Sequence, residues 1–229
     1  MSTLEIKLDT EEQMAAGARS RAYALLAEAA SFPDPALAAR FASGDWLDEF
    51  TGIVTFLPFA FELSDRSRGQ LARAPGREVL EHDYIRLFEV GAGRPFCPLY
   101  EGAHRGGRMK IMEELVRFYE HFGLKPATGD QPDHLCAELQ FMHFLAFKEA
   151  AAAESGQLSQ GLQSAQYDFL YRHLGKWLPR LVDRLDDARE PSAFYSALTT
   201  VTAAFCRADL WWLKECRENP DPQIGPLPD

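Results

Sequence analysis

The chain of 229 residues is short of basic residues, of cysteine pairs and of long apolar runs. Lysine and arginine together number 24, against 34 aspartates and glutamates, which gives a formal net charge of −10 at pH 7. A protein that binds a nucleic-acid backbone needs a basic face, so this deficit argues against nucleic acid as a partner. The same charge suits a cationic partner, or simply good solubility.

Cysteine usage and hydropathy limit the compartment. The four cysteines, at positions 97, 136, 206 and 216, include no pair with the two-residue spacing of a zinc knuckle or a redox dithiol. The first residues are charged and lack the apolar stretch of a secretory signal. The longest uncharged apolar stretch, about 50–61, contains Pro58 and is shorter than the roughly 20 residues of a membrane span. We expect a cytoplasmic protein with reduced thiols and no stable membrane insertion.

Signals for strands are also missing, because no segment alternates with period two and no Asn-Gly or Asp-Gly turn separates strand-like runs. Apolar residues instead recur at spacings of three and four, and 46% of the residues are hydrophobic, which is enough for a core. We predict an all-α, single-domain bundle of about eight to ten helices over residues 1–217. A Pro-rich disordered tail is expected over 218–229.

Capping signals and helix breakers place the elements. Thr10 and Gln13 have the spacing of a capping box, and a buried face is expected to follow at Ala18, Ala22, Leu25, Leu26 and Ala29. Other helices are expected over 45–61, 64–75, 77–89, 108–121, 130–154, 157–186 with a bend near Pro179, and 191–218, with Asp45 and Asp130 as N-caps. Seven glycines and prolines between 90 and 107 predict a long loop without regular structure, and such loops are usually functional or disordered.

Metal or nucleophile chemistry is one interpretation of the polar residues. Glu101 and His104 form a single Glu-x-x-His match, whereas a di-iron bundle needs two. His134 and Glu138 are one helical turn apart and could share a metal, although one could instead orient the helix start. A metal-dependent helical enzyme or metal carrier that uses either pair is therefore the alternative function. Cys97 lies in the loop and is expected to be the more exposed thiol, but no base accompanies it.

Two segments mix carboxylates with large apolar side chains: residues 81–88, which lead into 98–102, and residues 131–139. Such a mixture suits a groove for a peptide that is basic at one end and apolar beyond it. A purely structural role is also open, since Leu87 and Phe88 could belong to the core and Asp133 could stabilise the start of a helix. Arg86 could neutralise nearby acidic residues.

These segments resemble the TorD/DmsD/NarJ family of chaperones for molybdoenzyme maturation. The resemblance covers about residues 78–147, and the Pro-Asp-His-Leu block is its strongest piece. The matching pieces, in the order and spacing of the family, are Glu81-x-Asp83-Tyr84-x-x-Leu87-Phe88, Pro98-x-Tyr100-Glu101, Tyr119-x-x-x-Gly123-Leu124 and Pro132-Asp133-His134-Leu135-x-x-Glu138-Leu139-x-Phe141-Met142.

The resemblance implies a non-enzymatic chaperone without a cofactor of its own. It would bind the twin-arginine leader, or another N-terminal segment, of a molybdopterin-containing catalytic subunit and hold that subunit for cofactor insertion. It would be a monomer or a dimer that exchanges segments near the glycine-rich loop. The peptide-binding residues expected on this basis are Tyr84, Leu87, Phe88, Pro98, Tyr100, Glu101, Asp133, His134 and Glu138. Because His134 is expected in the first turn of a helix, where the helix dipole disfavours a cation, we expect its imidazole to be neutral near pH 7.

Overall fold

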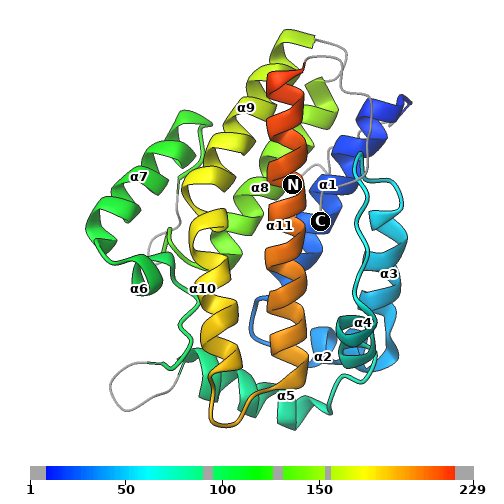
Figure 1. Cartoon of the computed structure of the whole chain (residues 1–229), viewed down its shortest axis with the longest axis vertical. Coiled ribbons are helices and arrows are strands. Elements are labelled where there is room, and N and C mark those ends of the chain that lie inside the picture. The colour runs from blue at the N-terminus through cyan, green and yellow to red at the C-terminus, as the bar shows by residue number, and fades with distance from the viewer. Residues whose placement is uncertain (1–8, 90–94, 126–130, 153–155, 220–229) are drawn as a thin grey trace.

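A computed structural model of the chain describes residues 9–89, 95–125, 131–152 and 156–219. Every regular element in these ranges is a helix, apart from one isolated β-bridge, so the all-α prediction is confirmed (Figure 1). The helices are α1 (Glu11–Ala29), α2 (Pro35–Ser43), α3 (Asp45–Val54), α4 (Asp65–Leu71), α5 (Arg77–Tyr84), the π-helix η1 (Ile85–Glu89), α6 (Glu101–Arg105), α7 (Arg108–His121), α8 (Leu135–Ala152), α9 (Gly156–Arg172), α10 (Leu174–Asp186) and α11 (Ala193–Glu218).

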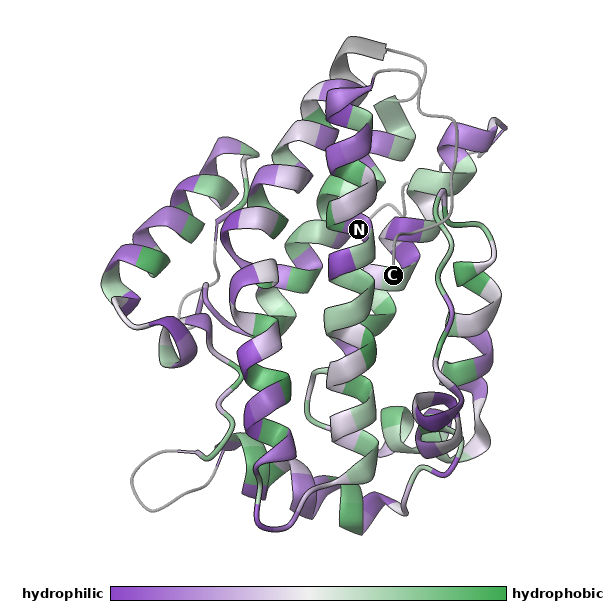
Figure 2. Cartoon of the chain, in the orientation of Figure 1, coloured by the Kyte–Doolittle hydropathy of each residue, from purple (hydrophilic) through white to green (hydrophobic). Residues whose placement is uncertain are grey.

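The centre of the bundle is formed by α1, α8, α9, α10 and α11. Helix α8 packs against α1 and α9, and α11 packs against both α9 and α10. Most residues of α8 are buried or half-buried, in keeping with its place between α1 and α9, and Figure 2 shows hydrophobic stretches on the helices of the bundle. Helix α7 lies at the outer edge of the bundle, beside the short α6 (Figure 1). None of the described helices is both long enough and apolar enough to cross a membrane.

The start of the chain follows its local signals. Thr10 and Gln13 form the expected capping box at the start of α1. All five residues of the expected buried face are less than 10% exposed: Ala18, Ala22, Leu25, Leu26 and Ala29. The helix expected over 64–75 is α4, which Ser64 caps and which ends earlier, at Leu71.

One expected helix and the expected tail have different limits in the structure. The helix expected over 45–61 ends at Val54, and its N-cap is Gly44 rather than Asp45. Gly44 has φ +87°, a left-handed conformation that ends α2 and starts α3 within a single residue. Of the tail expected over 218–229, Glu218 ends α11 and residues 220–229 lie outside the described residues.

The long helix expected over 157–186 is two helices, and the break is at His173 rather than near Pro179. The backbone of His173 is not helical, with φ −118° and ψ −97°. The carbonyl of Arg172 accepts a hydrogen bond from the Arg105 guanidinium at 2.7 Å. The buried His173 ring lies 2.8 Å from a carboxylate oxygen of Glu101. Both contacts tie the break to α6, so a distant segment determines where the helix stops.

Candidate peptide-binding site

The two segments that the sequence singles out meet through their backbones. The Glu101 N–H donates to the Asp133 carbonyl at 2.9 Å, and the Leu135 N–H donates to the Leu99 carbonyl at 2.8 Å. Between these bonds, Tyr100 and His134 form an antiparallel β-bridge. We call this pairing the Tyr100–His134 junction. The loop expected over 90–107 is therefore partly structured in its described portion, because the junction leads directly into α6.

The junction also sets the start of α8. This helix begins at Leu135, and Pro132 therefore lies before it rather than in its first turn. The expected N-cap, Asp130, lies outside the described residues. The His134 Nδ1 atom accepts a hydrogen bond from the Cys136 N–H at 3.2 Å, so the imidazole takes the part of a capping side chain. Burial lowers the pKa of His134, which agrees in direction with the neutral imidazole that we expect.

Asp133 is fully buried, but its partner reaches solvent. Its two carboxylate oxygens accept from Arg108 Nε at 3.2 Å and Arg108 Nη2 at 3.3 Å. The Gly102 N–H donates to the same carboxylate at 3.3 Å. The Arg108 side chain is 49% exposed. The Asp133 carboxylate, which we expected to bind a peptide, is thus already bound to Arg108 of the same chain.

Tyr100 and His134 are the half-buried, accessible part of the junction. Their rings are 4.9 Å apart between centroids, edge to face, and the Arg108 guanidinium lies 5.5 Å from the Tyr100 ring centroid. An aromatic ring, a neutral imidazole and a guanidinium bound to a carboxylate therefore lie together at the protein surface. Such a group can bind cationic and aromatic groups through cation–π contacts and hydrogen bonds.

Glu101 and Glu138 lie beneath the junction and are both 0% exposed. Glu101 is bound by Arg105 and by His173. Glu138 accepts from the Trp177 indole N–H at 3.1 Å, and burial, with Glu101 nearby, raises the pKa of Glu138 well above its usual range. Neither carboxylate reaches the surface in this conformation, so their predicted contact with a peptide would require a rearrangement.

Tyr84, Leu87 and Phe88 are buried too, each 5% exposed or less. The Tyr84 hydroxyl donates to the Ala30 carbonyl at 3.2 Å. Burial raises the pKa of Tyr84. The Cys97 N–H donates to the Leu87 carbonyl at 2.8 Å, which connects this cluster to the segment that leads into the junction. Of the two interpretations that the sequence leaves open for Leu87 and Phe88, the core position is the one found here.

The exposed apolar residues beside Tyr84 are ones that sequence reasoning missed. Phe32 is 41% exposed and its ring lies 5.5 Å from that of Tyr84, edge to face. Ile85 is 37% exposed and begins η1. Short π-helical segments are rare and are frequent at functional sites. No local signal in the sequence predicts that Phe32 is exposed. Pro33, the next residue, indicates only that a helix ends nearby.

Residues 47–183 match the sequence model of a known family, the nitrate reductase delta subunit. The chain belongs to this family. The chlorate reductase assembly chaperone protein of Ideonella dechloratans is 43% identical over 131 residues, which are 56% of this chain and 68% of that protein. The perchlorate reductase assembly chaperone protein of Dechloromonas aromatica is 36% identical over 216 residues, or 92% and 96% of the two chains. Chaperone protein TorD of Vibrio cholerae is 31% identical over 160 residues, 67% of each.

Family membership confirms the resemblance to TorD and NarJ proteins.

The structure also bears on the alternative function, a metal site. The four residues proposed as metal ligands all contact other groups of the chain. His104 Nε2 lies 2.7 Å from the carbonyl of the buried Pro98, His134 caps α8, and Glu101 and Glu138 have the partners described above. The described ranges contain no group of three or more His, Cys, Asp or Glu residues that could hold a metal ion.

The prediction that Cys97 is the more exposed thiol is wrong, because this residue is fully buried. Its N–H donates to the Leu87 carbonyl at 2.8 Å, which draws the residue against η1. Burial raises the pKa of the Cys97 thiol to about 11, so the reactive thiolate is scarce near neutral pH.

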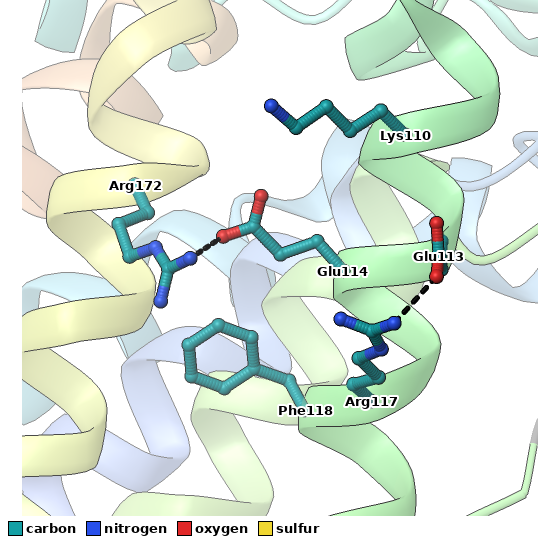
Figure 3. Close-up of a pocket in the computed structure, with 6 residues that line it drawn as sticks. All are labelled: Lys110, Glu113, Glu114, Arg117, Phe118 and Arg172. Atoms are coloured by element: carbon teal, nitrogen blue, oxygen red, sulfur yellow. Dashed lines mark hydrogen bonds and ion pairs between the residues drawn. The ribbon is translucent and has the colours of Figure 1, made fainter.

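A surface hollow of about 360 Å³ lies between α7 and α9 (Figure 3). Four of its five charged side chains form ion pairs, Arg172 with Glu114 and Arg117 with Glu113, and the fifth is Lys110. The Arg172 guanidinium also lies 5.5 Å from the Phe118 ring centroid. Because only Lys110 among these charged residues lacks an ion pair within the described part of the chain, the hollow has little net charge to attract a ligand.

Proposed function

We propose that this chain is a system-specific assembly chaperone of the cytoplasm. It binds the twin-arginine leader, or another N-terminal segment, of a molybdopterin-containing oxidoreductase catalytic subunit and holds that subunit for cofactor insertion. It does so as a binding protein, without catalysis. Membership of the delta subunit family and relatives named as assembly chaperones of chlorate and perchlorate reductases support this role, and they favour a client that reduces a small oxyanion.

The observation that carries the proposal is the Tyr100–His134 junction. It brings together two segments about 30 residues apart and leaves Tyr100, His134 and Arg108 partly exposed beside a buried carboxylate. A peptide with arginines can use charge-assisted hydrogen bonds and cation–π contacts at such a place. Its apolar portion can lie on the exposed side chains of Phe32 and Ile85.

The buried cluster of Tyr84, Leu87 and Phe88 would support this apolar surface from beneath. An unbound leader is flexible, and ordering it on binding opposes association, so we expect a dissociation constant on the order of micromolar. The protein would act as a monomer or as a dimer that exchanges segments, and sedimentation of the purified chain distinguishes the two.

Calorimetric titration with the client's leader peptide tests the proposal. We expect Asp133→Ala to weaken binding about tenfold, in line with the loss of one charge-assisted hydrogen bond. His134→Ala should weaken binding about threefold, because it removes the ring that packs edge to face against Tyr100. Circular dichroism must show that the helical fold survives, and Asp133→Asn serves where the alanine variant unfolds.

The matched control is His121→Ala, an exposed histidine at the far end of α7, about 20 Å along the helix from Arg108. It should bind the leader as the unmodified chain does. Unchanged affinity in folded variants of both Asp133 and His134 would count against the site, and no binding by the unmodified chain would count against the function.

A further inference from the structure

Arg108 occupies an unfavourable place for a cation. It is the first residue of α7, and no acidic side chain lies in the first turn of that helix. The helix dipole favours anions at this end and disfavours cations. Two charge-assisted bonds to Asp133 hold the guanidinium there, so this position depends on the carboxylate and not on the helix.

The surroundings of the guanidinium have the chemistry of an arginine-binding slot. Asp133 presents two oxygens to two nitrogens, and the Gln131 side-chain oxygen accepts from Arg108 Nη2 at 2.7 Å. The Tyr100 ring lies on one side, 5.5 Å from the guanidinium. Planar bidentate contact together with an aromatic face is the arrangement that guanidinium groups use and that ammonium groups cannot reproduce.

The stem of Arg108 is also accommodated by its neighbours. A Cβ at Gly102 would lie 2.5 Å from Arg108 Cγ and 2.8 Å from its Cβ, so only glycine leaves room for the stem there. Gly106 and Gly107 precede Arg108, with φ +74° and +67°. Backbone conformations of this kind suit glycine and can change readily. The side chain is half exposed, so it can move into solvent without disrupting the core.

We propose that Asp133, Gln131 and Tyr100 form a guanidinium-binding slot, which Arg108 fills in the free protein and which an arginine of the bound peptide takes over. The proposal rests on the proposed function and adds to it the identity of the group recognised and of the group displaced. Asp133 is fully buried, and a buried carboxylate without a partner is strongly disfavoured. Arg108 therefore leaves only when another guanidinium replaces it, which selects for arginine over lysine.

The first experiment tests the slot without any peptide. In Arg108→Ala the slot is vacant, and methylguanidinium at up to about 50 mM should raise the melting temperature by about 2–4 °C through binding to the folded state alone. Methylammonium at the same ionic strength should not. Arg108→Gln keeps most of the stem and serves where the alanine variant does not fold.

Arg117→Ala is the matched control, because it removes the same charge from the same helix at an exposed pair with Glu113. It should respond equally to the two salts, as the unmodified chain should. Adding Asp133→Asn to Arg108→Ala should abolish the response to methylguanidinium. Equal responses of Arg108→Ala to both salts would overturn the slot.

The second experiment measures displacement. If Arg108 competes with the peptide, Arg108→Ala should bind the arginine leader about tenfold more tightly than the unmodified chain, because the competent state is no longer masked. A leader with lysines in place of the two arginines should gain much less. Weaker binding of the arginine leader to Arg108→Ala would show that Arg108 only supports the site and would overturn the displacement.

The two failures are distinguishable. A chain that responds to methylguanidinium but binds no leader retains the slot and contradicts the proposed function. A chain that binds the leader, with no response to methylguanidinium and no gain in Arg108→Ala, retains the chaperone function and contradicts the slot.

Discussion

Gly102 is the residue with least room for a side chain at the junction. An added Cβ would meet Arg108 Cγ at 2.5 Å and Asp133 Oδ2 at 3.0 Å. We expect Gly102→Ala to lower the free energy of unfolding by about 1–3 kcal/mol, because the Arg108–Asp133 contact must shift. Denaturant unfolding measures the change. Gly161→Ala is the control, a glycine within α9 whose added Cβ meets nothing within 4 Å, and it should be neutral or stabilising. Equal effects at the two positions would contradict this account.

The histidines give a second prediction at this scale. Burial lowers the pKa of His134 below the ordinary 6.5, and it does the same for His104 and His143. Below about pH 6.5 the unfolded chain then binds more protons than the folded chain, so the free energy of unfolding falls as pH decreases. The slope is at most about 1.4 kcal/mol per pH unit for each histidine.

The contribution of His134 can be separated from those of the other groups by comparing how the free energy of unfolding depends on pH in the unmodified chain and in a His134 variant. The raised pKa of Glu138 acts in the opposite direction, because the folded chain retains that proton at pH values where the unfolded chain releases it. We therefore expect His134→Gln to make the slope between pH 7.5 and 5.5 shallower than in the unmodified chain, as measured by urea unfolding at each pH. A steeper slope in the variant would show that His134 is easier to protonate in the folded protein.

Sequence reasoning named residues that the fold brings together, but it did not predict their exposure. Tyr100, Asp133 and His134 do meet, as the family motif implies. The burial of Asp133 and its bond to Arg108 could not be predicted, since the partner lies 25 positions away and any of several arginines could have reached it. Local patterns state which side chains a segment has; they do not state which distant side chain satisfies them.

At the scale of elements, Arg19 of α1 fixes how four helices fit together. It is 0% exposed and bonds to Asp209 of α11 at 2.6 Å, to Glu149 of α8 at 2.7 Å and to Gln166 of α9 at 2.5 Å. The Tyr23 hydroxyl donates to the same Asp209 carboxylate at 2.7 Å. The two buried carboxylates depend on the Arg19 charge to offset their removal from water.

We expect Arg19→Met to lower the free energy of unfolding by about 3–5 kcal/mol, because it leaves two buried carboxylates without their cation. Arg21→Met is the control on the same helix. Its pair with Glu49 is partly exposed and should contribute less than about 1 kcal/mol. Thermal or urea unfolding of both variants measures the difference. Similar losses in the two variants would mean that the buried network contributes no more than a surface ion pair.

Element limits were predicted where local signals set them and missed where distant contacts do. The capping box of α1 is entirely local, and it was found from Thr10 and Gln13. The start of α8 at Leu135 depends on a bond to the Leu99 carbonyl, and the break at His173 depends on Arg105. Signals within a window of a few residues contain neither partner, so those two limits required the structure.

For the whole molecule, the class of fold could be predicted because helical spacing repeats throughout the chain and strand signals are missing. The arrangement of its surface could not. Phe32 lies in a loop and Ile85 begins η1, and both are exposed although their local sequence resembles that of the core. The net charge of −10 is a property of the whole chain that needs no structure, and it leads to the last prediction.

Attraction of a cationic leader should come mainly from this overall negative charge. The Asp133 and Glu101 carboxylates are already paired with Arg108 and Arg105. The initial attraction of the leader therefore comes from the long-range field and not from an unpaired carboxylate at the junction. That field extends about 30 Å at 0.01 M salt and about 8 Å at 0.15 M. We expect the association rate to fall about tenfold between these salt concentrations, with a much smaller change in the dissociation rate. Stopped-flow mixing with a fluorescent leader measures both rates.

A leader whose basic residues outside the arginine pair are replaced by glutamine should lose most of this dependence of the association rate on salt. If salt changed chiefly the dissociation rate, direct ion pairs to exposed carboxylates would dominate instead, and Asp133 would have to be free of Arg108 in solution.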